Sequence, residues 1–334
     1  MIPFPCNRFR KALPFLIGVI LALAGATMIA YATTWGPWVK SDSVEYVEAA
    51  RNLAVGKGLV LERASGKVVP LSLRPPLYSL VLAGLLTLGL DAIEAGRFLA
   101  ISLIFGLVLL LSLLSQYTEH RYVLPLGIAA YILTLPTFVV ASTGLMSESL
   151  FILLTLLAIS LAVGFLFYRR RALLPVAAAL AGLAMLTRFA GIACILVVAL
   201  VPFLENQVRL GRRIIRAMSV VLIGALPFAL WTLSVRAAGY SPGVYALPSE
   251  NLWDALRPVR GAYVDMLWEW LPLRLLIPID TYRPKAAILF LLCAILVWAA
   301  ARLFLRVKQH SGSIDSQAFL SITGILLLLF AAAH

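Results

Sequence analysis

Long uncharged stretches separated by short polar segments dominate the chain. A helix needs about 20 residues, with latitude of several, to cross roughly 30 Å of hydrocarbon. Runs of about that length cover residues 12–34, 98–115, 122–141, 149–168, 217–235 and 317–333. Shorter runs cover residues 77–90, 172–187, 189–204 and 286–302. The pattern predicts an all-α polytopic membrane protein, and the direction of each crossing decides which short runs are spans.

Composition supports a membrane protein and argues against several functional classes. Hydrophobic residues make up 62% of the chain and charged residues 13%, with a mean hydropathy of +0.98, whereas about a quarter of the residues in a soluble domain are charged. The net charge of +13 comes mainly from arginines in short loops, where the positive-inside rule and anionic lipid explain them without nucleic acid. The three isolated cysteines suggest neither a disulfide framework nor a zinc site.

Clusters of arginine predict the direction of the spans. The basic groups at 169–171 and 209–216 are both expected in the cytoplasm, so an even number of crossings must separate them. Two short spans therefore meet at Arg188 on the outer side. The first span, preceded by basic residues, is expected to be a retained signal anchor with a cytoplasmic amino terminus. The same parity requires that the run 77–90 does not cross, which suits a re-entrant or interfacial helix.

These directions predict about nine transmembrane helices in a single membrane domain of residues 1–334. Two outer segments are large: a first outer loop at 35–97 with juxtamembrane helices, and a second at 236–285 that is expected to cover the membrane face. Of the fifteen acidic residues, only Glu119, Glu205 and Asp315 fall on the inner side. This segregation supports the topology because the acids were not used to derive it. The predicted localisation is the inner (plasma) membrane.

Carboxylates are scarce in the chain, so two of them attract attention. Asp42 lies in a polar stretch directly after the first span, and Glu148 lies at the outer end of another. Each has a structural explanation. Asp42 and Glu45 have the spacing of a capping box at the start of a helix that Gly56 and Gly58 would end. Glu148 at a helix start would be favoured by the helix macrodipole.

Three arginines are expected on the same membrane face as these acids. Arg74 precedes Pro75 and Pro76 at the stiff entry to the interfacial segment, where a simple anchor is an alternative. Arg188 could extend to lipid phosphate or bind the phosphate of a substrate. With Arg97, they place guanidinium groups beside carboxylates at a bilayer. This combination suits transfer from a lipid-linked phosphate donor, since a carboxylate can take a proton while arginines stabilise the departing phosphate.

The ordered set of motifs resembles the polytopic GT-C glycosyltransferases, specifically bacterial relatives of protein O-mannosyltransferases and of the aminoarabinose transferases that act on lipid A. The resemblance covers about residues 12–205, and its motifs lie at 42–46, 49–53, 56–58, 74–78, 94–97, 146–151 and 182–188. It implies a GT-C-like fold with juxtamembrane helices in the first outer loop. It also implies a sugar donor carried on a polyprenyl phosphate and an inverting reaction at the outer face.

The resemblance assigns roles residue by residue. Asp42 matches the general base and Glu148 the second acid of the site, where relatives often have aspartate. The first-loop motif that supports the site comprises Glu45, Tyr46, Pro75, Pro76 and Tyr78. From their charge and their expected membrane face, rather than from the resemblance, the arginines at 74, 97 and 188 are expected to bind the donor phosphate. No cofactor is expected and no metal cluster is evident, although a divalent metal stays open. The acceptor would be a lipid, a glycan or a protein.

The chain stops at His334, where relatives usually continue through further spans and an outer carboxy-terminal part. The expectation is therefore a truncated product or one that relies on a partner subunit. Two other readings stay open. One is a transporter or lipid flippase, although nearly all ionisable groups lie outside the proposed spans and no repeat is evident. The other is a non-catalytic protein with a GT-C-like fold.

Overall fold

The computed structural model describes residues 6–115, 123–205 and 208–243. The chain divides into two compact units, Met1–Gly243 and Val244–His334, and the described residues all belong to the first. That unit contains ten α-helices, a short 3-10 helix and one two-stranded hairpin among its described residues: α1 (Cys6–Ala32), α2 (Ser41–Ala54), β1 (Val60–Glu62), β2 (Val68–Pro70), α3 (Leu77–Thr87), α4 (Ala92–Ser115), α5 (Val123–Thr134), α6 (Pro136–Thr143), α7 (Glu148–Tyr168), α8 (Leu173–Thr187), α9 (Gly191–Leu200), η1 (Val201–Leu204) and α10 (Leu210–Ala237).

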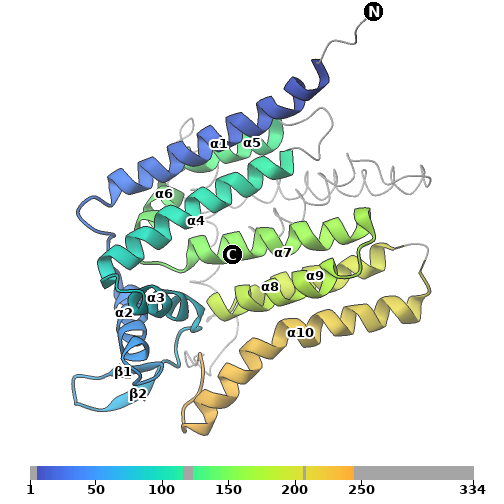
Figure 1. Ribbon diagram of the computed structural model, residues 1–334. Helices are drawn as coiled ribbons and strands as arrows, with labels where there is room; N and C mark the ends of the chain where they lie inside the picture. Colours follow the sequence, from blue (N-terminus) through green and yellow to red (C-terminus); the bar gives the residue numbers. More distant parts are fainter. Residues whose placement is uncertain (1–5, 116–122, 206–207, 244–334) are drawn as a thin grey trace, which may run out of the picture. The chain divides into compact units, whose positions relative to one another are not determined.

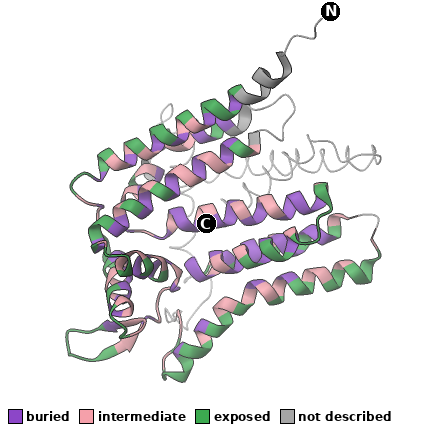
Figure 2. Cartoon of the chain, in the orientation of Figure 1, coloured by how far each residue is buried: buried purple, intermediate pink, exposed green. Residues whose placement is uncertain are grey.

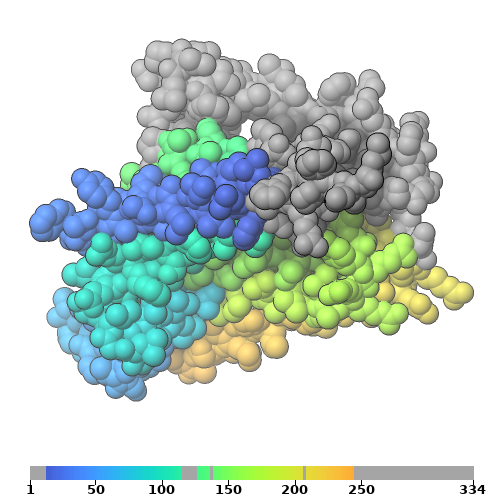
Figure 3. Space-filling view, turned by 45° about the horizontal axis from the view of Figure 1, so that its top comes forward, coloured from blue at the N-terminus to red at the C-terminus, as the bar shows by residue number. Residues whose placement is uncertain are grey.

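Four of the described helices, α1, α4, α7 and α10, are long and apolar enough to cross a membrane. They coincide with four of the expected spans. Large apolar side chains such as Leu16, Ile20 and Leu23 stay exposed on α1, as lipid-facing side chains do. Figure 3 shows this helix lying over α4. The described part is therefore a helical protein suited to a membrane, as the apolar runs predicted.

The remaining expected spans are shorter than predicted or lie outside the described residues. The run 122–141 is not one continuous helix, because α5 ends at Thr134 and α6 starts at Pro136. Leu135 between them is extended, which is the conformation that a following proline favours. The helices α8 and α9 have 15 and 10 residues, too few to count as full-length spans. The runs 286–302 and 317–333 lie outside the described residues, so the count of nine stays a prediction.

The first connecting segment has more structure than the sequence indicated. Its helix α3 has 11 residues, about 16 Å at 1.5 Å per residue, which agrees with a segment that does not cross. Strands β1 and β2 pair antiparallel, with Leu61 opposite Val69, and this hairpin was not predicted. Helix α4 begins at Ala92, inside the segment 35–97 expected as the first outer loop, and already contains Arg97.

Sequence-distant helix ends gather at one end of the unit (Figure 1). The carboxyl ends of α1 and α8 and the amino ends of α4 and α7 lie there, together with α2, α3 and the hairpin. The basic segments that follow α7 and precede α10 lie at the other end. The two basic segments thus share one end of the unit, and the starts of α2 and α7 lie at the other. Which side of a membrane each end faces stays a prediction. The second outer loop, 236–285, lies almost entirely outside the described residues.

The centre of the unit is α7, which packs against α4, α8 and α9. Buried positions follow it along most of its length (Figure 2), whereas α1 and α10 keep broad exposed faces. Where α8 meets α10, Gly182 faces the backbone of Gly224 closely enough that a side chain would not fit. Small residues at such crossings are typical of membrane helices, because they let the backbones approach. This contact fixes the position of the end of α8, which carries Arg188.

Candidate active site

Asp42 lies in the first turn of α2, but it does not cap the helix. The N-cap is Lys40, and the backbone N–H of Lys40 donates to the hydroxyl of Ser43 at 3.0 Å. The expected pairing of Asp42 and Glu45 in a capping box was therefore wrong. Asp42 lies two residues past the cap, so its carboxylate is available for contacts outside its own helix. Val55 ends α2, and Gly56 and Gly58 adopt positive φ as expected.

The carboxylate of Asp42 binds Arg74. Nη2 of Arg74 donates to Oδ1 of Asp42 at 2.6 Å, and Ser41 donates to the same oxygen at 3.2 Å. Oδ2 of Asp42 has no hydrogen-bond partner among the described residues. Glu45, one turn further along α2, has Oε2 at 3.7 Å from Nε of Arg74. On its other side, Oε1 of Glu45 lies 3.7 Å from Nη1 of Arg63. Two carboxylates and two guanidinium groups thus alternate along one face of α2.

A second ion pair joins α7 to the turn after α8. Glu148 is the first residue of α7, and its Oε1 accepts from Nη1 of Arg188 at 2.6 Å. Arg188 follows the last residue of α8 and precedes α9, so it lies in the turn that the parity argument placed there. Oε2 of Glu148 is buried without a hydrogen-bond partner among the described residues. Both side chains are about one-third exposed, which leaves this pair reachable from solvent.

Tyr46 lies within electrostatic reach of both ion pairs and contacts the neighbourhood of one of them. Its hydroxyl lies 3.3 Å from Oγ of Ser147, and that oxygen also lies 3.5 Å from Nη1 of Arg188. The ring of Tyr46 packs edge-on against Tyr78 of α3 at 5.1 Å between centroids. Burial raises the pKa of both phenols, and the negative charge of Glu148 adds to the rise. Arg188 and Arg74 act in the opposite direction on the pKa of Tyr46. One phenol therefore lies within electrostatic reach of both arginines and of Glu148.

Contacts between two linkers bring Asp42 near Glu148, although the residues are far apart in sequence. The linker before α2 runs beside the linker before α7: the N–H of Leu145 donates to the carbonyl of Trp38 at 3.1 Å. The indole of Trp38 donates to the carbonyl of Val140 at 2.6 Å. Gly144 is required at this position because a Cβ would meet the Trp38 ring at 2.7 Å. These contacts hold the segment that precedes Asp42 beside the segment that precedes Glu148.

Two prolines follow Arg74 and help to fix the position of its segment. Pro75 and Pro76 are both buried, and Pro76 directly precedes the first residue of α3. At the start of this helix, Leu77 packs against Leu186, Trp231 and Val235. The segment with Arg74 is therefore tied to the ends of α8 and α10. This agrees with the expected stiff entry to a short helix.

Arg97 does not join this cluster through any contact of the described residues. Its Nη2 donates to the carbonyl of Ala30 at 3.0 Å, in the last turn of α1. A positive charge beside the carbonyl end of a helix is favourable. The contact therefore gives Arg97 a structural role that joins α4 to α1, and its expected contact with a donor phosphate stays a prediction without support from the geometry.

Two residues of the cluster were not predicted. Ser147 connects Tyr46 to Arg188, and Arg63 approaches Glu45 from the loop of the hairpin. Ser147 lies next to Glu148 in the sequence, but a serine before a helix is ordinary. Arg63 reaches Glu45 only because of the hairpin, which was not predicted. No group of three or more metal-binding side chains occurs in the part of the chain that the structure describes.

A groove of about 460 Å³ lies beside the cluster rather than inside it. Its lining includes Ser43, Val44, Glu48 and Arg51 of α2, with Leu145 on the opposite side. Asp42 and Arg74 are not among the residues that line it. The groove follows the face of α2 next to the one that carries the ion pairs. The groove is therefore lined by both apolar and polar side chains and lies at the same end of the unit as the ion pairs.

The cluster as a whole offers paired carboxylates and guanidinium groups at one end of membrane-length helices. Its acids can accept protons, and its arginines can bind an anion once an ion pair opens. Comparisons with known proteins add no assignment: no protein-family model matches the chain, and neither the curated proteins nor the solved structures gave a match.

Proposed function

We propose that the chain is a membrane glycosyltransferase that moves a sugar from a polyprenyl-phosphate donor to an acceptor at one membrane face. The observation that carries this proposal is the meeting of two carboxylate–arginine pairs, Asp42–Arg74 and Glu148–Arg188, around Tyr46. Four separate elements supply these residues. One ion pair suffices to hold two segments together. Two pairs that both act on one buried phenol supply an acid for proton removal and arginines for phosphate departure.

In the proposed reaction, the hydroxyl oxygen of the acceptor attacks the anomeric carbon while the bond from that carbon to the donor phosphate breaks. Oδ2 of Asp42 takes the hydroxyl proton, because Oδ1 is occupied by Arg74. The polyprenyl phosphate that leaves carries the bonding electrons, and Arg188 and Arg74 stabilise its charge. Attack opposite to the leaving group inverts the anomeric carbon. Glu148 holds Arg188 in place before the donor binds.

The decisive test is transfer by the purified full chain, with a polyprenyl-phosphate sugar as donor and a mixture of lipid, glycan and peptide acceptors. Asp42→Asn should lower turnover by roughly 10² to 10⁴, which is typical for a lost general base. Glu62→Gln is the matched control, because Glu62 forms an exposed ion pair with Lys57 at 2.8 Å. That variant should retain turnover. Equal activity of Asp42→Asn and the native chain would remove Asp42 from the reaction.

The same preparation separates the proposal from its rivals. Reconstituted in liposomes, a flippase would move a labelled polyprenyl phosphate across the bilayer without any transfer of sugar. A non-catalytic protein would bind the donor with no turnover under any acceptor. The proposal places the reaction at the periplasmic or external face of the inner membrane, with about nine spans and a cytoplasmic amino terminus. A cysteine-accessibility scan at the α8–α9 turn would test that orientation.

A further inference from the structure

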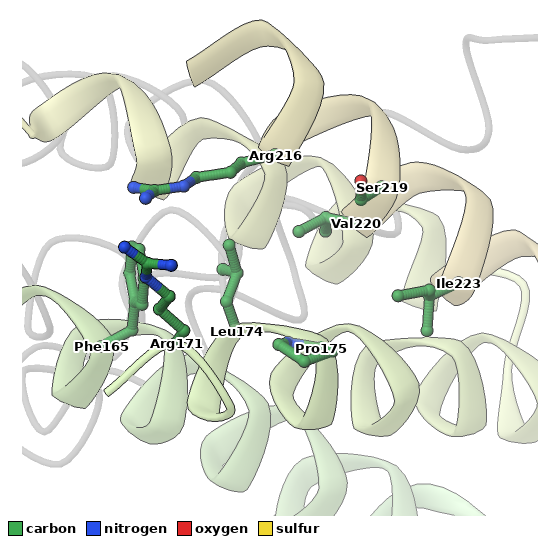
Figure 4. A pocket seen from close by; sticks show the side chains of 8 residues that line it. All are labelled: Phe165, Arg171, Leu174, Pro175, Arg216, Ser219, Val220 and Ile223. Carbon is green, nitrogen blue, oxygen red and sulfur yellow. The ribbon is translucent and has the colours of Figure 1, made fainter. Parts of the chain in front are cut away.

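A second groove lies at the opposite end of the unit, between α8 and α10. It encloses about 230 Å³, and its lining residues are Phe165, Arg171, Leu174, Pro175, Arg216, Ser219, Val220 and Ile223. The glycosyltransferase proposal uses none of them. Figure 4 shows the guanidinium groups of Arg171 and Arg216 together at one end of the groove, while Pro175 and Ile223 lie toward the other. The groove is therefore cationic at one end and apolar along its length.

The two arginines differ in how they are held. Arg216 of α10 pairs with Glu205 and lies over the ring of Phe165, 5.6 Å from its centroid. Arg171 lies in the turn between α7 and α8, is exposed, and has no partner among the described residues. Glu205 compensates one of the two charges, so Arg171 supplies a net positive charge at the mouth. The guanidinium groups of Arg171 and Arg216 can both donate hydrogen bonds to one anion that lies between them.

The apolar part of the groove indicates what that anion is attached to. Leu174 and Val220 are buried in its floor, whereas Pro175 and Ser219 are exposed along its rim. Helix α10 is long enough to span a membrane and keeps a broad exposed face (Figure 2), so the groove opens beside a helix that is suited to face lipid. A small free anion would leave the apolar walls in contact with water. A lipid with a phosphate headgroup satisfies both parts, since basic sites between membrane helices bind such headgroups.

We propose that this groove binds an anionic phospholipid, with its phosphate between Arg171 and Arg216 and one acyl chain along Leu174, Val220 and Ile223. The site is separate from the Asp42 cluster, because it lies at the other end of the helices. It does not depend on the glycosyltransferase proposal. The bound lipid would join the α7–α8 turn to the start of α10.

The test uses the full chain in nanodiscs that contain a photoactivatable phosphatidylglycerol with its reactive group on an acyl chain. After illumination, mass spectrometry of the peptides should show labelling at 173–176 and 219–223. Unlabelled phosphatidylglycerol should compete, whereas phosphatidylcholine and inorganic phosphate should not. Arg171→Gln should lower labelling about fivefold, and Arg171→Gln with Arg216→Gln about twenty-fivefold, because each arginine that binds the phosphate contributes about a factor of five.

The matched control is the double variant Arg170→Gln and Arg212→Gln, which removes two exposed positive charges from the same end without touching the groove. Its labelling should stay within twofold of the native chain. Ser219→Phe fills the groove without changing charge and should abolish labelling, which keeps the test valid if loss of the Glu205 pair disturbs folding. Equal losses in both double variants would overturn the proposal.

Three further outcomes would also overturn it. Competition by phosphatidylcholine as strong as that by phosphatidylglycerol would mean ordinary lipid contact. Displacement by inorganic phosphate would mean a small-anion site. Absence of labelling at the groove, with labelling elsewhere on α10, would mean that a protein segment fills it.

Discussion

Replacement of Gly182 by alanine should destabilise the protein through a backbone clash that no side chain can relieve. A Cβ at Gly182 would overlap the carbonyl oxygen of Gly224 and lie 3.1 Å from its Cα. The helices α8 and α10 would have to separate. Overpacking of this kind costs about 1–3 kcal/mol, while alanine in a helix regains up to about 1 kcal/mol over glycine.

A series of three variants isolates the steric contribution. At Gly224, a Cβ would meet only side-chain carbons of Ile195 at 3.1 to 3.2 Å, which can move by a few tenths of an ångström. At Gly106, the nearest atom is Cδ2 of Leu153 at 3.5 Å, an ordinary contact. Because the helix-propensity gain is common to all three, stability should fall in the order Gly106→Ala, Gly224→Ala, Gly182→Ala. We expect Gly182→Ala to lie about 1–3 kcal/mol below Gly106→Ala.

The assay is unfolding of the purified chain in mixed micelles with increasing denaturing detergent, followed by tryptophan fluorescence. Sugar transfer measured in parallel should fall in the same order, because α8 carries Arg188 to the site. If Gly182→Ala proved as stable as Gly106→Ala, the helices would not cross at these glycines. The position of Arg188 beside Glu148 would then lose its structural basis.

Three other predictions concern the site and its support. Glu148→Gln and Arg188→Gln should be non-additive in a double-mutant cycle of unfolding, with a coupling of about 0.5–1 kcal/mol for this partly exposed pair; additive losses would mean that they do not interact. Burial and nearby negative charge raise the pKa of Tyr78, so the folded state holds its proton more tightly. The free energy of unfolding should therefore fall above about pH 10 by up to about 1.4 kcal/mol per pH unit, and Tyr78→Phe should remove that share when unfolding is compared at about pH 9 and about pH 11. Asn52 donates to the carbonyl of Val60 at 2.9 Å, so Asn52→Leu should cost about 1–3 kcal/mol in unfolding free energy and unchanged stability would refute this role.

Local chemistry explains why parts of the candidate site could be read from the chain. The start of α7 at Glu148, the turn at Arg188 and the end of α2 before Gly56 all follow from charge, polarity or glycine at the boundary of an apolar run. Pairing could not be read in the same way. The spacing of Asp42 and Glu45 suggested a contact inside the first turn of α2. The carboxylate of Asp42 instead binds Arg74 from another segment.

The corrections have the same physical origin. The N-cap of α2 is Lys40 rather than Asp42, because the hydroxyl of Ser43 accepts a hydrogen bond from the backbone N–H of Lys40. The spacing of Asp42 and Glu45 suggested the same kind of bond two residues later. The run 122–141 was read by hydropathy, which does not register the restriction that Pro136 places on Leu135. Arg97 joined the candidate site only through its predicted side of the membrane, and the structure gives it a contact with α1 instead.

The sequence by itself indicated the four long apolar helices and the shared end at which Asp42 and Glu148 lie, because hydropathy and arginine placement act locally along the chain. Tertiary structure alone decided that Asp42 and Glu148 each take an arginine from another element and that Tyr46 approaches Arg188 through Ser147. It also decided that Arg171 and Arg216 share a groove. These contacts depend on how helices cross, at Gly182 and Gly224 for example, and a glycine in one helix does not say which residue of another helix it meets.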